Sequence, residues 1–451
     1  MTRQPDRIED AYRAALGVMV EDTPPPPEWA DLSADDPIHW RPTSTPRRGW
    51  TAAVVAAGVI LVLVGGIAVS LLVLDSGEDV IEQTPTPTIS APSSGAWRAV
   101  PGSGRHRDIW IHKHTGAAYD AGSDLVVTSG GGLEAGRLWF DANTDQWTSS
   151  DTEFDVGPYG DPRAEVYVYG DPRAEVYDPV SGCVIVVTNE GFTFAFDVDT
   201  GTWTDLAPGQ GPSPGRRTGQ AMVYDTESEK VVMFGGGELT VVFETGGVAQ
   251  ALGDTWTYDP AQNLWTEQES ASLPPPRVWP TMVYDSESDR VVLFGGAELG
   301  TGATLSSGNF IPETWLGVYG DTWIYDTNTG TWTEMHPPVS PPARAQAVMW
   351  YDPDADLVFL YGGTSRVANR PLSAEMFGGE ELWAYDLDTD AWTLYQVDSP
   401  NPGLLVSAEA AFDIESGVAV VFDGFHETEA GNLVYNTKTW IYEHSESQAP
   451  D

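Results

Sequence analysis

The chain has 451 residues, enough for one large domain or two to three ordinary ones. Its 67 acidic residues outnumber 22 Lys and Arg, and the formal net charge of −45 excludes binding to nucleic acid through bulk attraction. The single cysteine, Cys183, excludes an intrachain disulfide and a multi-cysteine metal site. The acidity itself is explained first by solubility or adaptation to salt. The 18 Trp, 17 Tyr and 47 Gly residues indicate an all-β chain rich in turns.

Residues 1–48 are expected to form a small cytoplasmic tail. Residues 6–21 fit one short amphipathic helix, and the four prolines at 24–27 enforce an extended stretch. The tail is too short to bury a core of its own. It is therefore interpreted as a tether, with docking of a cytoplasmic partner as the alternative.

Residues 49–74 are predicted to form a transmembrane helix. Residues 50–74 carry no charge, and about 20 apolar residues suffice to cross a bilayer. Arg47 and Arg48 precede the segment, whereas Asp75 and Glu78 follow it, so the positive-inside rule places the N-terminus in the cytoplasm. The leader and the apolar run are too long for a cleaved signal peptide. The sequence thus predicts a single-pass plasma-membrane protein whose larger part lies outside.

A Pro/Thr/Ser-rich linker at residues 75–95 is followed by an internal repeat. The first repeat signature is an aromatic residue and Asp, a short turn, and an apolar strand that often ends in Gly-Gly. Its six copies begin at Tyr119, Tyr177, Tyr224, Tyr284, Tyr351 and Phe412. A second signature, Asp followed six residues later by Trp, comes after each of the first five copies: Asp141/Trp147, Asp197/Trp203, Asp259/Trp265, Asp326/Trp332 and Asp386/Trp392.

The repeat predicts four strands per copy. Each Asp can close a hairpin as an Asx turn, because its carboxylate accepts hydrogen bonds from the backbone ahead of it. The apolar runs fit strands buried between neighbouring sheets, and each Trp can pack between sheets. Four-stranded units arranged radially make a β-propeller.

These motifs resemble kelch repeats, of the type found in the central domain of galactose oxidase, over residues 96–445. The resemblance implies an all-β, six-bladed propeller. The Gly-, Ala- and Arg-rich, Lys-poor composition indicates a bacterial protein, so the predicted anchor would attach the propeller to a bacterial membrane. The sequence departs from the kelch pattern in places. Arg217, Arg277 and Arg344 fit its arginine position, but no histidine stands three residues later. The second copy has no Gly-Gly, and the sixth has Asp423-Gly424.

The sixth copy also lacks its final Trp, since the chain soon continues into a polar tail at residues 446–451. Trp97 lies before the first copy without strands of its own. We therefore expect its strand to complete the last blade beside Trp440 and close the ring.

Long loops between the second and third strands, at 235–253, 295–320, 362–380 and 423–437, occur only in blades three to six. They predict an asymmetric functional face. Trp315 and Phe377 are candidate apolar contacts there, or else pack the loops against the rim. Arg217, Arg277 and Arg344 are candidates for binding a carboxylate ligand. The alternative is that each arginine pairs with a local acid.

Three histidines are candidate metal ligands. His112 and His114 precede blade one, and His426 lies in the long loop of blade six, which closure of the ring would place next to it. Three imidazoles can bind zinc or copper. Chance placement in loops is the alternative, and no cofactor is expected on balance. Glu238 and Glu298 alone are too few for calcium.

The favoured function is a non-catalytic, extracytoplasmic binding module for a protein or glycan, without nucleic-acid binding. The resemblance leaves a carbohydrate-active enzyme as the alternative, similar to galactose oxidase or to sialate epimerases. The oxidase chemistry needs a Tyr cross-linked to Cys, and Cys183 is expected in a hairpin turn away from the functional face. No catalytic residues are assigned, because no nucleophile elbow, P-loop or zincin helix is present.

Overall fold

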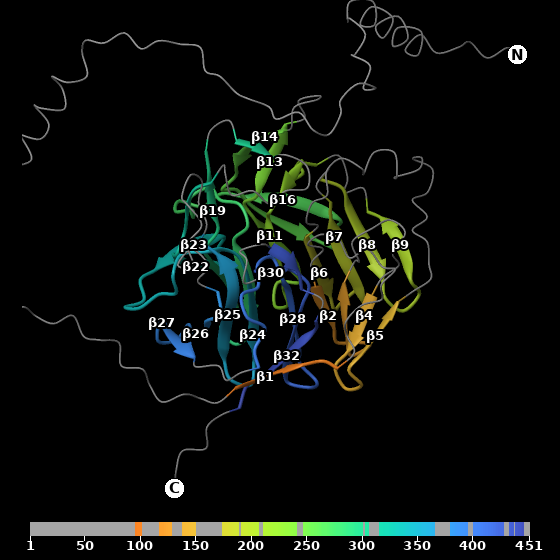
Figure 1. The fold of residues 1–451 in the computed structure, drawn as a ribbon. Coiled ribbons are helices and arrows are strands. Elements are labelled where there is room, and N and C mark those ends of the chain that lie inside the picture. Colours follow the sequence, from red (N-terminus) through yellow and green to blue (C-terminus); the bar gives the residue numbers. More distant parts are fainter. Residues whose placement is uncertain are drawn as a thin grey trace, which may run out of the picture. The chain divides into compact units, whose positions relative to one another are not determined.

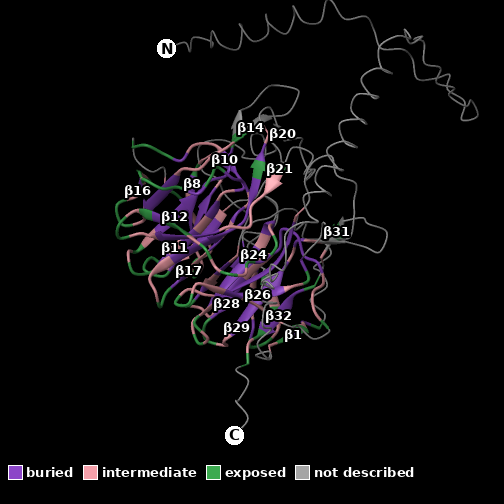
Figure 2. Ribbon diagram, turned by 90° about the vertical axis from the view of Figure 1, so that its left-hand side faces the viewer, coloured by how far each residue is buried: buried purple, intermediate pink, exposed green. Residues whose placement is uncertain are grey.

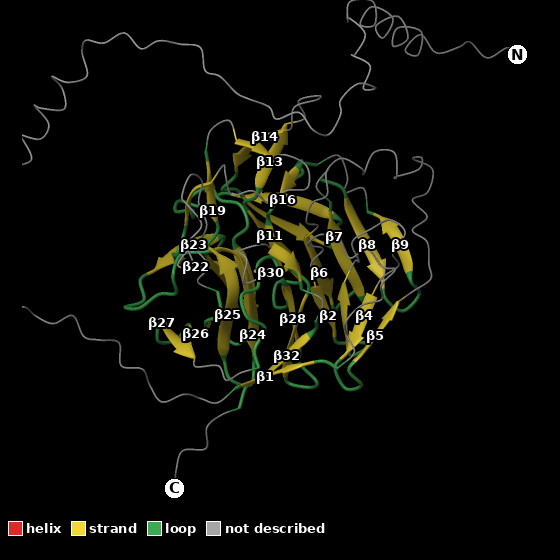
Figure 3. Ribbon diagram, in the orientation of Figure 1, coloured by secondary structure: helices red, strands yellow, loops and turns green. Residues whose placement is uncertain are grey.

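A computed structural model describes residues 95–101, 117–128, 138–149, 174–188, 191–206, 211–240, 247–300, 303–305, 315–365, 379–395, 400–427, 433–436 and 438–445. All of them belong to one compact unit, residues 85–451. They form strands, turns and loops without a helix (Figures 1 and 3). In this part of the chain no helix could span a membrane. The predicted tail, transmembrane segment and almost all of the linker, together with residues 446–451, lie outside the described residues.

Six antiparallel four-stranded sheets repeat one plan, and we number them 1 to 6 along the chain. Sheets 1 to 3 consist of β2 (Ala117–Asp120), β3 (Leu125–Thr128), β4 (Leu138–Asp141) and β5 (Gln146–Ser149); β6 (Ala174–Asp178), β7 (Cys183–Val187), β8 (Thr193–Asp197) and β9 (Thr202–Asp205); β11 (Ala221–Asp225), β12 (Lys230–Phe234), β15 (Thr255–Asp259) and β16 (Leu264–Gln268). Sheets 4 to 6 consist of β17 (Thr281–Asp285), β18 (Arg290–Phe294), β22 (Thr322–Asp326) and β23 (Thr331–Met335); β24 (Ala345–Asp352), β25 (Leu357–Thr364), β26 (Leu382–Asp386) and β27 (Ala391–Tyr395); β28 (Glu409–Asp413), β29 (Val418–Phe422), β32 (Trp440–Glu443) and β1 (Ala96–Ala99).

The first strands of the six sheets contact one another in a cycle, β2–β6–β11–β17–β24–β28 and back to β2. Each sheet runs outward from its first strand, so the sheets pack face to face around the cycle. Figure 2 shows buried residues along the strands and exposed residues in the turns. The end where tight turns join the first and second strands is called the turn face. The opposite end, where Gly-Gly follows the second strand, is called the mouth.

The predicted Asx turns are confirmed in all six sheets. In sheet 3, for example, Asp225 Oδ1 accepts the backbone N–H groups of Glu227 and Ser228 at 2.9 and 3.0 Å. The fourth turn residue then takes a left-handed conformation, as Glu229 does with φ of 55°. The equivalent caps are Asp120, Asp178, Asp285, Asp352 and Asp413. All six are buried, so each carboxylate depends on these hydrogen bonds for compensation.

The repeated tryptophans join neighbouring sheets through a hydrogen bond as well as by packing. In four of the six sheets, the indole on the fourth strand donates to a threonine at or just before the start of the third strand in the preceding sheet. The described pairs are Trp147–Thr439 at 2.8 Å, Trp265–Thr193 at 3.0 Å, Trp332–Thr255 at 2.8 Å and Trp392–Thr322 at 3.0 Å. A buried indole N–H thus finds a partner without interrupting the apolar layer.

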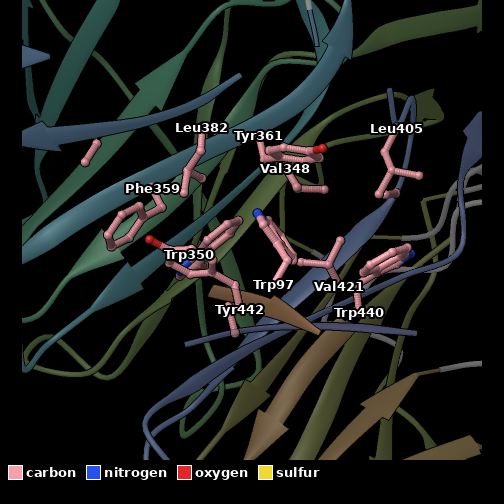
Figure 4. Packing of buried hydrophobic residues seen from close by; sticks show 13 residues of the cluster. Trp97, Val348, Trp350, Phe359, Tyr361, Leu382, Leu405, Val421, Trp440 and Tyr442 are labelled. Atoms are coloured by element: carbon pink, nitrogen blue, oxygen red, sulfur yellow. The ribbon is translucent and has the colours of Figure 1, made fainter. Parts of the chain in front are cut away.

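The expected closure by the N-terminal strand is confirmed. Strand β1 pairs with β32, with Trp97 opposite Tyr442 and Ala99 opposite Trp440. Trp97 is buried, and its ring lies 5.1 Å from Tyr361 and from Tyr442 between centroids (Figure 4). Sheet 6 is therefore built from both ends of the described chain.

The start of β1 and the end of β32, where the chain enters and leaves sheet 6, both lie on the turn face. Ala96 and Val418 both pair with Glu443, at the end of the sheet next to the turn that follows Asp413. His444, just beyond β32, lies with its Nδ1 3.7 Å from Oδ2 of Asp352 in sheet 5. The chain therefore enters and leaves the propeller opposite the mouth.

Candidate functional site

The mouth is extended by hairpins that grow from sheets 3, 4 and 6. One additional sheet joins β10 (Arg217–Thr218), β13 (Gly237–Thr240), β14 (Gly247–Ala251) and β20 (Ala303–Leu305), and two-stranded pairs join β19 (Ala297–Leu299) with β21 (Trp315–Val318) and β30 (Phe425–Glu427) with β31 (Leu433–Tyr435). Pairing of β14 with β20 links the long loops of sheets 3 and 4. A small core of Val278, Ala297, Leu299 and Ala345 lies beneath them. The described parts of the long loops of sheets 3 and 4 are therefore paired strands that lie over a small core.

The first two candidate arginines each make a bidentate ion pair with the aspartate that precedes the third strand of the sheet that follows in the chain. Arg277 donates from Nη1 and Nη2 to the two carboxylate oxygens of Asp321, both at 2.7 Å. It also donates to the carbonyls of Pro275 and Gly295 at 3.0 and 2.8 Å. Trp323 Nε1 donates to Asp321 at 2.8 Å. This network satisfies both the guanidinium and the carboxylate.

Sheet 3 repeats this network with Arg217, Asp254 and Trp256. The guanidinium–carboxylate distances are 2.9 and 2.8 Å, and the indole donates to Asp254 at 2.6 Å. Arg217 also donates to the carbonyls of Pro214 and Gly235. The repetition indicates a structural unit that fixes the segment between consecutive sheets.

The network weakens in sheet 5 and is replaced in sheet 6. Arg344 reaches Glu381 through one contact of 3.4 Å, and burial lowers the pKa of its guanidinium. In sheet 6 the arginine position holds Leu405 and the acid position holds Lys438. Sheet 6 thus lacks both the arginine and the acid, as expected because an arginine buried without its acid would be costly.

Burial reverses the charge that the arginines were predicted to present at the mouth. The side chains of Arg217, Arg277 and Arg344 are at most 2% exposed, whereas those of Asp254, Asp321 and Glu381 are 22%, 21% and 42% exposed. The Tyr319 ring covers Arg277, with the guanidinium carbon 4.2 Å from its centroid. The geometry supports the alternative of local pairing and turns carboxylate oxygens outward. Ligand binding by the arginines stays a prediction.

Backbone hydrogen bonds join sheets 3 to 6 at the mouth. Trp279 N donates to Gly219 O at 2.7 Å, Gln346 N to Trp279 O at 3.2 Å, and Ser407 N to Gln346 O at 2.9 Å. All four residues have positive φ, which is uncommon for Trp, Gln and Ser. Only glycine fits at position 219, because a Cβ there would lie 2.8 Å from Trp279 Nε1. This arc holds the inner edge of the mouth in one conformation.

Asp423 is a mouth residue that sequence reasoning noted but did not select as a site. It stands where sheets 3 to 5 have the first glycine of Gly-Gly, and it keeps their left-handed conformation with φ of 56°. Part of its surface stays accessible, yet the dense surroundings desolvate the carboxyl and raise its pKa to about 7. A strained acid with a shifted pKa at a mouth is a typical functional residue.

Replacement of Asp423 by glycine is expected to stabilise the chain more at pH 8 than at pH 5. The raised pKa means that the folded state retains a proton that the unfolded state loses between about pH 4 and pH 7, so wild-type stability falls across this window. We expect the gain in free energy of unfolding to be about 2–3 kcal/mol larger at pH 8. Denaturant titrations at the two pH values measure it. An equal gain at both values would contradict the pKa assignment.

The remaining candidate residues are only partly visible or lie outside the described residues. The backbones of Trp315 and His426 belong to β21 and β30, and their side chains are not described. Phe377, His112 and His114 lie outside the described residues. Among the side chains that are described, no three His, Cys, Asp or Glu residues form a metal-binding group.

His112 and His114 stand at repeat positions that other sheets fill with Arg277 and Trp279, a correspondence that the sequence analysis missed. His112 precedes its capping Asp120 by eight residues, as Arg277 precedes Asp285. His114 precedes it by six, as Trp279 does in sheet 4. Aligning all six copies on the capping Asp would have revealed these positions from sequence.

Comparison with known families identifies the repeat. The KLHDC2/KLHL20/DRC7 Kelch-repeats domain matches residues 182–404 and 240–450, which together span more than half of the chain. The chain belongs to the kelch-repeat family. A solved structure titled "Structure of YjhT" has 14% sequence identity and a TM-score of 0.45, and the match covers 72% of this chain and 93% of that one.

The kelch glycine pair has a clear role in this propeller. In sheet 3, a Cβ on Gly235 would lie 2.9 Å from the carbonyl oxygen of Arg277 in the next sheet. Gly236 N donates to that same oxygen at 2.9 Å. The kelch double glycine therefore permits close contact between consecutive sheets, which explains its position at the mouth.

Proposed function

We propose that this kelch protein is a six-bladed, membrane-anchored binding module that holds an extracytoplasmic protein or glycan at its mouth. The observation that carries the proposal is the position of the built hairpins of sheets 3, 4 and 6 opposite the face where the chain enters and leaves. A tether on the turn face leaves the mouth accessible. Loops on a rigid scaffold are the usual place for binding residues.

The charges at the mouth favour a ligand that donates hydrogen bonds. Asp254 and Asp321 use their paired oxygens for arginine and indole but keep about a fifth of their surface exposed. Glu238 and Glu298 are exposed on the neighbouring hairpins. Arg344, with its single ion pair of 3.4 Å, is the arginine for which a ligand carboxylate would compete most readily.

A binding screen with matched variants tests the mouth. The purified chain is applied to glycan and peptide arrays, and each hit is measured again with Asp423→Gly and Glu298→Ala at the mouth. Glu267→Ala is the control, because Glu267 is exposed on β16, the outermost strand of sheet 3. We expect the mouth variants to lower affinity at least tenfold, which corresponds to about 1.4 kcal/mol, and the control to leave it unchanged. Equal binding by all variants would refute the mouth as the site. Stoichiometric copper together with sugar oxidation would show that the protein is an enzyme and would refute the proposed binding function.

Protease protection tests the proposed topology. Protease added to intact cells is expected to remove everything after about residue 75 and leave a membrane-bound N-terminal fragment. The reason is that Arg47 and Arg48 keep the N-terminal side of the apolar segment in the cytoplasm. Permeabilised cells should lose the N-terminal fragment as well. Protection of the propeller in intact cells would reverse the orientation.

A further inference from the structure

The six tight turns of the turn face share one backbone conformation but differ in the residues they expose. In each, the capping Asp fixes the turn and the fourth residue is left-handed. The first two turn residues point away from the sheets and are mostly exposed. Since β2 contacts both β28 and β6, the turns of sheets 6, 1 and 2 are consecutive around the cycle.

One half of this face, called the apolar half, exposes apolar side chains in each turn together with one exposed acid, Glu415. The turn of sheet 6 exposes Ile414 with 61% of its surface, and that of sheet 2 exposes Val180 with 66%. Ala121 in sheet 1 and Pro179 in sheet 2 are exposed between them. Sheets 3 and 4 place Thr226 or Ser286 and a glutamate at the same positions, so the turn itself does not require apolar residues.

The other half is acidic. The exposed acids in the turns of sheets 3 to 5 are Glu227, Glu229, Glu287, Asp354 and Asp356. The six turns are flanked by only two cations, Lys230 and Arg290. Arg290 is already paired, with distances of 3.1 Å to Asp326 and 3.8 Å to Asp289. Most of the negative charge on this half is therefore uncompensated within the turns.

We propose that the turn face is a second docking surface, separate from the mouth, for a partner protein segment that carries apolar side chains beside Lys or Arg. The apolar half would receive the apolar side chains and the acidic half the cations. Charge complementarity selects this occupant, because a second copy of a chain with net charge −45 would be repelled. The turns are already rigid, so docking costs little ordering entropy.

Two peptides of equal charge test the surface. The full chain is titrated with a fluorescent amphipathic Leu/Lys peptide and with its Ser/Lys counterpart, and binding is followed by anisotropy. We expect the wild type to bind the Leu/Lys peptide about tenfold more tightly, as burial of two apolar side chains predicts. The double variant Val180→Ser and Ile414→Ser should lose this preference and keep its affinity for the Ser/Lys peptide.

Controls separate the surface from general stickiness. Leu316→Ser removes an apolar side chain that is 64% exposed on the mouth hairpin, and should retain the preference. Glu227→Gln with Glu287→Gln should weaken both peptides and reduce the salt dependence. Ile414→Ser places at position 414 the residue that Ser286 provides at the equivalent position of sheet 4. The variant is therefore expected to fold, and its melting temperature verifies this. A double variant that keeps the preference, or charge variants that bind as the wild type does, would overturn the proposal.

Discussion

Replacement of Asp321 by alanine is expected to lower the free energy of unfolding by about 3–5 kcal/mol, because it leaves a buried guanidinium without its counter-charge. Arg277 has no exposed surface and donates two of its hydrogen bonds to Asp321. The carbonyls of Pro275 and Gly295 remain but do not neutralise the charge. Urea titration at neutral pH measures the loss. A loss below about 1 kcal/mol would show that water or another group replaces the carboxylate.

Glu381→Ala is the matched control. Its side chain is 42% exposed and contacts Arg344 only at 3.4 Å, so solvent already screens the pair. We expect a loss of at most about 1 kcal/mol. A loss as large as that of Asp321→Ala would mean that the two networks are equivalent despite their geometry.

The Asp321 pair also predicts an acid limb of stability. Burial opposes ionisation of Asp321, but hydrogen bonds and attraction from Arg277 outweigh it and lower the pKa of the carboxyl. The contribution of the ionised Asp321 carboxylate to the free energy of unfolding is present above the unfolded-state pKa of about 3.9. It is lost as pH falls through the lower folded-state pKa. Wild-type stability should therefore decrease more steeply below about pH 4 than that of Asp321→Ala.

Trp97→Ala is expected to destabilise the propeller by about 3–5 kcal/mol, the range for a large buried aromatic side chain. Trp97 closes the ring, and it packs on Trp350, Tyr361 and Tyr442. Its strand has only four residues, so loss of the indole removes the main anchor of β1. Thermal and denaturant unfolding measure the effect. Unchanged melting would show that the Trp97 indole does not anchor β1.

A smaller substitution distinguishes Trp97 from the other repeated tryptophans. Leu382 occupies the place of the threonine that accepts the indole hydrogen bond elsewhere, and among the described residues Trp97 Nε1 has no acceptor. Trp97→Phe should therefore cost about 1 kcal/mol less than Trp332→Phe, which also breaks the 2.8 Å bond to Thr255. Equal losses would show that the hydrogen bond contributes nothing.

The repeat and most of the local structure can be read from the sequence. The aromatic-Asp signature located all six first-to-second-strand turns, because an Asx turn depends on one side chain and the backbone beside it. The unpaired Trp97 strand and the incomplete sixth copy together predicted how the ring closes. Both inferences rest on local chemistry or on counting strands.

The charge that each mouth residue presents depends on contacts between residues that are far apart in the sequence. Sequence shows Arg277 at a recurrent position, but it does not show that Asp321, 44 residues later, reaches both of its terminal nitrogens. It likewise gives Asp423 no unusual property, although desolvation by burial in the folded chain raises the pKa of its carboxyl. Ionisation and exposure depend on neighbours that only the assembled sheets bring together. The repeat therefore predicts the scaffold, whereas the chemistry of its two faces follows from three-dimensional packing.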